Sequence, residues 1–216
     1  LPFAISVVSL VGLAMMHLFL PVLAPVLMRA AGQPPEAYGM VAGAMYCGAV
    51  WLFIANSAFT PTLGPIRALQ LGAVIASTGA ALVMSGSYGL ILLGAALMGF
   101  GYATTTPAGS QILSDHTPRR YRSSLFSIRQ AGVPLGGVAS GTIGGLLIAT
   151  HGWRTALAVV AGICLTIAAG LFLAPRDLND SRPRQAFRLA NLFALGNVVE
   201  PFRIVAGIAG LTRLAA

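Results

Sequence analysis

Six long apolar segments joined by short connectors constrain the fold of this chain most strongly. A helix needs about 20 apolar residues to cross the hydrocarbon core of a bilayer, because it rises about 1.5 Å per residue. Such segments lie near residues 1–28, 38–60, 68–86, 89–112, 125–150 and 155–174. Only 8% of the residues are charged and 56% are hydrophobic. We therefore predict an all-α membrane protein with six transmembrane helices over residues 1–174.

The fifth segment contains FSIRQAGVPLGGVASGTIGG at 126–145, which is rich in glycine and includes Pro134. In a soluble helix each glycine costs roughly 1 kcal/mol relative to alanine, and a proline costs about 3 kcal/mol. In a bilayer the helix must satisfy its own backbone hydrogen bonds, and glycines spaced by four let a neighbouring helix approach closely. The pairs with this spacing are Gly132 and Gly136, Gly137 and Gly141, and Gly141 and Gly145. The segment therefore predicts a tightly packed membrane helix.

The arginines fall in the connectors, which explains the net charge of +8 by membrane topology and not by nucleic-acid binding. If the chain starts inside, the cytoplasmic arginines are Arg67, Arg119, Arg120, Arg122, Arg176, Arg182, Arg184, Arg188, Arg203 and Arg213. Only Arg29 and Arg154 then face out, and Arg129 lies within a span. This distribution follows the positive-inside rule. We expect a multi-pass protein of a bacterial inner membrane, with the N-terminus and residues 175–216 in the cytoplasm.

The two ends of the sequence suggest a piece of a longer protein. The chain begins at Leu1, already inside an apolar segment, so we expect residues upstream. Residues 175–188 are polar and arginine-rich, and residues 189–216 are too interrupted by polar side chains to span a membrane. An apolar residue recurs at every third position from Phe202 to Leu211, which suits either a short helix on the inner membrane surface or an ordinary flexible linker. We interpret 175–216 as a cytoplasmic linker that leads towards a second half.

Five motifs follow one another along the chain: PTLGPIRALQLG at 61–72, GAALMGFGYATTTPAGSQIL at 94–113, DHTPRRYRSS at 115–124, the fifth span quoted above, and GWRTAL at 152–157. In this order they resemble the amino-terminal six-helix half of a major facilitator superfamily (MFS) transporter. The resemblance covers nearly the whole chain. It implies a bundle built from a three-plus-three inverted repeat, although spans one and four share only a late proline and upstream glycines.

The chain also departs from the family's patterns. Pro61 and Thr62 stand where the loop between spans two and three usually carries Asp-Arg, so interdomain contacts of that aspartate do not transfer. Ala95 occupies the position, four residues before Gly99, where drug/proton antiporters often hold an arginine. This second departure weakens a prediction of antiporter-type proton coupling.

In the family, spans one, two, four and five line a central cavity, and the polar residues of this chain fit that arrangement. The substrate-binding residues that the resemblance implies are His17, Tyr46, Asn56, Tyr102, Thr105, Arg129 and Gln130. Helical spacing places Tyr102 on one face with Thr105 and Thr106, and Tyr46 on one face with Phe53 and Asn56.

Each of the main candidates also has a structural interpretation. His17 is the ionisable residue nearest the middle of a span, which favours solute contact or proton handling, but it could instead hydrogen-bond another helix. Arg129 could extend to the inner headgroups, or it could face the cavity as a cation that favours an anionic solute, such as a carboxylate. The threonines before Pro107 could bond to their own helix backbone.

Prolines in the cavity-lining spans, at positions 21, 25, 107 and 134, can bend helices and suit alternating access between two bundles. We therefore expect a secondary transporter, not an enzyme, that moves a small solute, with an organic anion among the candidates, and that has a second six-helix half and the lipid bilayer as partners. We expect no nucleic-acid partner, and no motif indicates a cofactor, metal or nucleotide. The alternatives are a non-transporting six-helix scaffold or receptor and an intramembrane protease. The protease alternative is disfavoured because spans four to six contain no histidine that could act as the base for Ser110 or Ser140.

Overall fold

The computed structural model describes residues 2–175 and 178, apart from the side chains of 56–61. Every regular element in this part of the chain is helical, and the helices form six spans, as predicted. Span one is α1 (Pro2–Ala30), span two is η1 (Pro35–Ala37) with α2 (Tyr38–Leu63), and span three is α3 (Pro65–Val83). Span four comprises α4 (Tyr88–Ala103) and α5 (Thr105–His116). Span five comprises η2 (Arg119–Tyr121), α6 (Arg122–Gln130), α7 (Gly132–Ala139), a π-helical segment (Ser140–Gly144) and α8 (Gly145–His151). Span six is α9 (Trp153–Gly170) with η4 (Leu171–Leu173).

The predicted linker and surface helix over 175–216 lie outside the described residues, except for positions 175 and 178.

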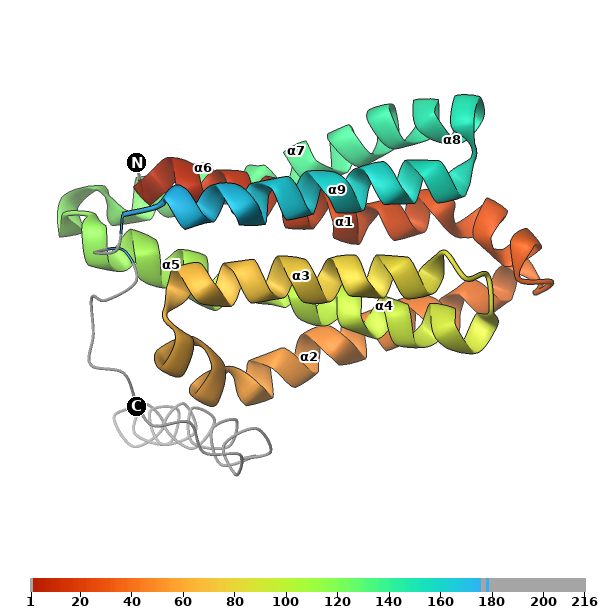
Figure 1. Cartoon of the computed structure of the whole chain (residues 1–216). Coiled ribbons are helices and arrows are strands. Elements are labelled where there is room, and N and C mark those ends of the chain that lie inside the picture. Colours follow the sequence, from red (N-terminus) through yellow and green to blue (C-terminus); the bar gives the residue numbers. More distant parts are fainter. Residues whose placement is uncertain (1, 176–177, 179–216) are drawn as a thin grey trace, which may run out of the picture.

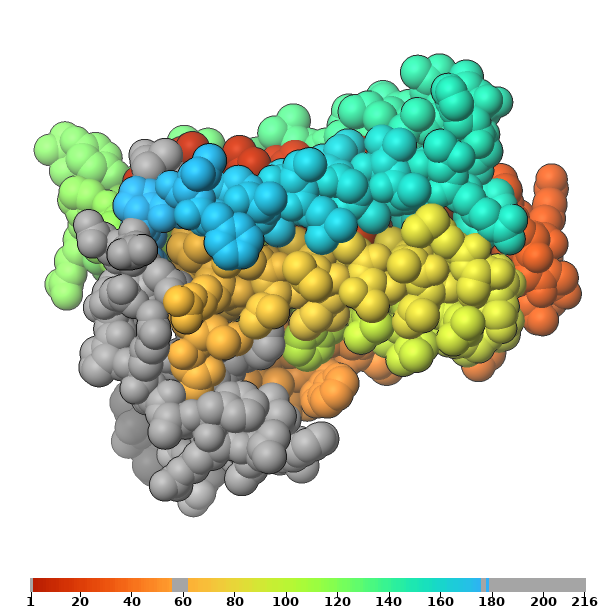
Figure 2. All heavy atoms as spheres, in the orientation of Figure 1, coloured from red at the N-terminus to blue at the C-terminus, as the bar shows by residue number. Residues whose placement is uncertain are grey.

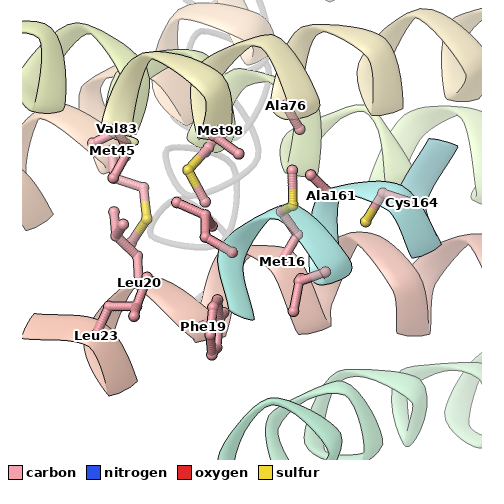
Figure 3. Close-up of a cluster of buried hydrophobic side chains, with 14 of the residues drawn as sticks. Met16, Phe19, Leu20, Leu23, Met45, Ala76, Val83, Met98, Ala161 and Cys164 are labelled. Atoms are coloured by element: carbon pink, nitrogen blue, oxygen red, sulfur yellow. The ribbon is translucent and has the colours of Figure 1, made fainter. Parts of the chain in front are cut away.

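The spans pack as two groups that meet at α1 and along the contact between α3 and α9. On one side α4 lies between α2 and α3, and on the other α1 packs against α7 and α9 (Figure 1). Side chains of α1, α2, α3, α4 and α9 form one apolar core between the groups, and Figure 3 shows Phe19 and Leu20 of α1 in it with Met45 of α2 and Met98 of α4. In water such a core forms by the hydrophobic effect, whereas in a bilayer it depends on close packing.

Glycines bring the backbones of neighbouring spans together. A Cβ placed on Gly48 of α2 would collide with the carbonyl oxygen of Ala96, and one on Gly99 of α4 would collide with the carbonyl oxygen of Met45. The small residues therefore let α2 and α4 touch along their backbones. On α7, a Cβ on Gly136 would lie 2.7 Å from the Met15 nitrogen of α1.

The glycine prediction for the fifth span is correct only in its first half. Gly132 and Gly136 face α1, but Gly141 and Gly145 have open space around their Cβ positions. Gly144, which belongs to none of the predicted pairs, faces the ring of Phe19 instead. The π-helical segment accounts for the difference, because its wider turn shifts the register of all residues after it.

Spans four and five are both interrupted near a proline. Span four breaks at Thr104 and span five at Ala131, and in each the proline is the third residue of the next helix, Pro107 in α5 and Pro134 in α7. A proline cannot donate the hydrogen bond of a regular helix and crowds the preceding turn. Pro21 and Pro25, by contrast, lie inside a continuous α1.

The connectors separate into two ends of the bundle. The start of α1, the turn between α2 and α3, the turn between α5 and α6, and the end of α9 lie at one end (Figure 1). Arg67, Arg119, Arg120 and Arg122 are at this end, whereas Arg29 and Arg154 are at the other. The structure thus confirms that the first four arginines share one end, which we refer to as the arginine-rich end.

Candidate solute-binding site

Three aromatic side chains from three spans meet near the middle of the bundle. The imidazole of His17 on α1 stacks on the ring of Tyr102 on α4, with centroids 4.2 Å apart and an interplanar angle of 19°. The ring of Tyr46 on α2 meets the imidazole edge-on, at 5.9 Å and 76°. Spans one, two and four, which the family resemblance assigns to a cavity, therefore contribute one side chain each to this aromatic cluster.

The cluster has an enclosed base and an exposed edge. His17 is buried, and its Nδ1 is enclosed without a hydrogen-bond partner among the described residues. Tyr102 is half-buried, while Tyr46 is 61% exposed. A buried imidazole nitrogen without a partner is costly, because burial removes its hydrogen bonds to water.

The hydroxyl group of Thr105 forms a hydrogen bond within its own span. Thr105 is fully buried, and its Oγ1 donates to the carbonyl oxygen of Tyr102 at 2.8 Å. Thr104 does the same to Gly101 at 2.7 Å. These bonds confirm the alternative in which the threonines bond back to their own helix. The helix breaks at Thr104 and leaves Thr105 buried and Thr106 exposed, so the shared face of Tyr102, Thr105 and Thr106 stays a prediction.

Arg129 neither extends to the headgroups nor faces an open cavity. Its side chain is only 2% exposed, at the end of α6. Nε donates to Ser6 Oγ of α1 at 2.6 Å, and one terminal nitrogen donates to the carbonyl oxygen of Thr105 at 2.5 Å. The prediction that this arginine extends to the inner headgroups is therefore wrong. Ser6 and Thr105, on neighbouring helices, accept the hydrogen bonds of the guanidinium group within the bundle.

A glycine on span four makes room for the arginine. A Cβ on Gly109 of α5 would collide with the guanidinium group of Arg129, whose Cζ would lie 2.8 Å away. Ser6 completes the contact, since its hydroxyl donates to the carbonyl oxygen of Gly109 at 3.3 Å. Arg129, Ser6, Thr105 and Gly109 thus form one arginine junction between spans one, four and five.

Two other candidates remain, Gln130 beside Arg129 and Asn56 on span two. Gln130 is exposed, and its Oε1 accepts a 3.4 Å hydrogen bond from Arg129. The side chain of Asn56 is outside the described residues, so its predicted role stays a prediction. Sequence reasoning missed Ser6 and Gly109, because neither is ionisable or large. The available signal was that a glycine of α5 lies one turn beyond Thr105, on the buried side of that helix.

Carboxylates lie only at the ends of the described spans. The described acidic residues are Glu36, in η1, and Asp115, near the end of α5. The aromatic cluster therefore has imidazole, phenol and backbone groups around it, and the nearest cation in the described spans is Arg129. Tyr102 lies close enough to Arg129 to interact with it electrostatically.

The comparisons with known proteins agree with this fold. The model of the Major Facilitator Superfamily matches residues 5–212 of the chain. The glucose transporter GlcP of Staphylococcus epidermidis is 28% identical over 156 residues, which are 69% of this chain and 34% of that protein. The chain belongs to the Major Facilitator Superfamily, a family of membrane transporters, and corresponds to its amino-terminal six-helix half.

Solved structures share the fold at low sequence identity. Two crystal structures of a bacterial homolog of the human lysosomal transporter Spinster superpose on the chain. The inward-facing, occupied form gives a TM-score of 0.60 at 19% identity, over 80% of this chain and 43% of that one. The unoccupied form gives 0.59 at 18% identity, over 86% and 43%. The chain thus spans less than half the length of these relatives.

Proposed function

We propose that the chain forms the amino-terminal half of a secondary active transporter, which moves a small solute across the membrane by alternating access. One observation carries the proposal: His17, Tyr46 and Tyr102 converge from three different spans at mid-membrane depth, with Tyr46 exposed. Side chains on separate helices change their mutual distances when those helices tilt, which links solute contact to a conformational change. The chain's membership of a family of membrane transporters supports the same assignment.

The chemistry around the cluster favours a neutral or anionic solute. The described spans place no carboxylate beside it, so a cationic solute would have no opposite charge there. Phenol and imidazole groups can hydrogen-bond hydroxyl or carboxylate oxygens. An organic anion attracted by Arg129 stays within the proposal, but the guanidinium group would have to release Ser6 or Thr105 to bind it directly. The relative GlcP bears the name glucose transporter, which makes hexoses the first neutral solutes to try.

A second six-helix half would cover the two least enclosed spans. In spans two and five only 22% of the most apolar stretch is buried, against 61% in span one. Their exposed side chains are large and apolar: Met40, Val50 and Phe53 on α2, and Leu135, Val138 and Leu146 on span five. Such surfaces suit a partner bundle of the same kind, with the solute between the two halves.

The orientation follows from the charges at the two ends. We infer that the arginine-rich end faces the cytoplasm of a bacterial inner membrane, so that the N-terminus and residues 175–216 are cytoplasmic. On this proposal residues 1–174 form the bundle and 175–216 form a linker to the second half. Transport requires no covalent chemistry, and we accordingly propose that the protein is not an enzyme.

The test is solute uptake by the purified full-length protein in proteoliposomes, with a panel of hexoses and small carboxylates. His17→Phe keeps a ring that can stack on Tyr102 but removes both imidazole nitrogens. We expect it to lower uptake at least tenfold while the protein stays folded. His151→Phe, at the exposed outer end of α8, is the matched control and should transport normally. If no solute is taken up and none raises the melting temperature, the chain is a scaffold or receptor instead.

A further inference from the structure

A groove runs along the outer surface of the bundle between α3 and α9, away from the aromatic cluster. It has a volume of about 540 Å³, and its lining includes Arg67, Gln70, Leu71 and Val74 of α3 and Leu165 and Ala168 of α9. The seam between these two helices crosses the face seen in Figure 2. All but two of the lining residues are apolar, and Leu71, Val74 and Leu165 are exposed. The groove therefore opens towards the lipid and not towards the interior of the bundle.

The floor of the groove is fixed by polar contacts between the two helices. Gln70 Nε2 donates to the carbonyl oxygen of Ala168 at 3.3 Å, and Ser77 Oγ donates to that of Ala161 at 3.4 Å. Because these bonds tie α3 to α9 within the membrane, the groove is a preformed feature of the bundle. Gln70 is thereby occupied, which leaves Arg67 as the polar group available to a ligand.

Arg67 lies where a lipid headgroup would be. It is the third residue of α3, a helix of 19 residues that is about 28 Å long at 1.5 Å per residue, close to the thickness of the hydrocarbon core. The start of α3 is therefore at the membrane boundary. Arg67 is exposed, and the described residues provide it with no hydrogen-bond or ion-pair partner. From there the groove extends to Val74, about 10 Å deeper along the helix.

We propose that this groove binds one anionic phospholipid, with its phosphate on Arg67 and one acyl chain between α3 and α9. Guanidinium groups bind phosphate through two parallel hydrogen bonds, and basic pockets between spans at the cytoplasmic side recognise anionic headgroups. The apolar walls match an acyl chain over the inner leaflet, which the bilayer supplies at this depth. Bound in this way, the lipid bridges spans three and six, neither of which contributes a side chain to the aromatic cluster.

The experiment is native mass spectrometry of the purified full-length protein, titrated with phosphatidylglycerol or with phosphatidylcholine. Wild type should bind phosphatidylglycerol more tightly. Arg67→Gln should weaken phosphatidylglycerol binding about fivefold and leave phosphatidylcholine unchanged, since one cation near an anionic headgroup contributes about that factor. Arg119→Gln removes an equal charge at the same end, outside the groove, and should change neither lipid.

A second pair of variants tests the acyl chain. Val74→Trp fills the deep end of the groove and should weaken both lipids, whereas Val159→Trp, also exposed but outside the groove, should weaken neither. The proposal is overturned if the two lipids bind wild type equally, or if Arg67→Gln and Arg119→Gln have the same effect. It is also overturned if Val74→Trp converts a dimer to a monomer without changing lipid binding, because a second copy of the chain would then occupy the groove. None of these results depends on transport.

Discussion

Arg129 on α6 donates a hydrogen bond to the backbone carbonyl oxygen of Thr105, directly after the break in span four. Ser6 on α1 accepts from the same guanidinium group. One buried cation thus joins three spans near the arginine-rich end, and its acceptors are neutral oxygens. Because the charge is satisfied by the protein itself, it acts first as a structural group.

Removing the Arg129 guanidinium should therefore destabilise the bundle. We expect Arg129→Gln to lower the free energy of unfolding by about 1–3 kcal/mol, because hydrogen bonds from a charged donor are lost and Thr105 is left without its partner. Arg120→Gln, at an exposed position over the ring of Tyr121, should have little effect. The measurement is unfolding in mixed micelles. Normal stability with loss of carboxylate uptake would instead identify Arg129 as a solute-binding cation.

A methyl group at Gly109 should disturb the same junction. We expect Gly109→Ala to lower the melting temperature, because its Cβ would collide with the guanidinium group of Arg129. In an Arg129→Gln background the same substitution should cost less, and a double-mutant cycle measures the difference. Gly89→Ala is the control, because nothing lies within 4 Å of a Cβ at that position. Equal costs in both backgrounds would contradict the contact.

The backbone contact between α2 and α4 should be sensitive to side-chain size. Gly99→Val would force α4 away from the carbonyl oxygen of Met45, and we expect a loss of about 1–3 kcal/mol or a failure to fold. Gly43→Val, on α2 with open space around its Cβ, should be tolerated. Folded yield and melting temperature in detergent provide the comparison. Similar behaviour of the two variants would mean that the helices do not touch at Gly99.

The hydroxyl of Ser77 joins spans three and six, and its removal should have a small but measurable cost. We expect Ser77→Ala to lower the free energy of unfolding by about 0.6 kcal/mol, the typical contribution of a hydrogen bond between membrane helices. Thr78→Val should cost less, because Thr78 Oγ1 bonds only to Val74 of its own helix, at an exposed position. A larger loss for Thr78→Val than for Ser77→Ala would argue against a bond between the two spans.

The six spans were predictable because their length and apolar character follow from the thickness of the bilayer, which acts on each helix separately. The grouping of His17, Tyr46 and Tyr102 was also foreseen in part, since all three lie in spans assigned to the cavity. The position of Arg129 was not. Spacing within one helix gives the depth of a side chain, but the acceptors that decide its direction, Ser6 and Thr105, belong to other helices.

The breaks at Thr104 and Ala131 could not be predicted from the sequence of one helix either. Pro107 and Pro134 indicated bends, yet Pro21 and Pro25 have the same chemistry and lie in a continuous helix. Whether a proline breaks its helix depends on how neighbouring groups satisfy the freed carbonyl oxygens. At span four the hydroxyl groups of Thr104 and Thr105 bond to the carbonyl oxygens of Gly101 and Tyr102 at the end of α4, and only the folded structure reveals these bonds. Neither bond reaches the carbonyl oxygen of Ala103, which Pro107 leaves without its helical donor.

The π-helical segment at Ser140–Gly144 determines which way the outer third of span five faces. A π turn accommodates one more residue than an α turn, and each residue of an α-helix advances the chain by about 100° around the axis. If the same residues followed a regular α-helix instead, α8 would therefore be rotated by about that angle relative to α7. Gly144 would leave the ring of Phe19, and a bulkier neighbour would take its place against α1. The extra residue keeps the smallest side chain of the span opposite the largest ring of its partner.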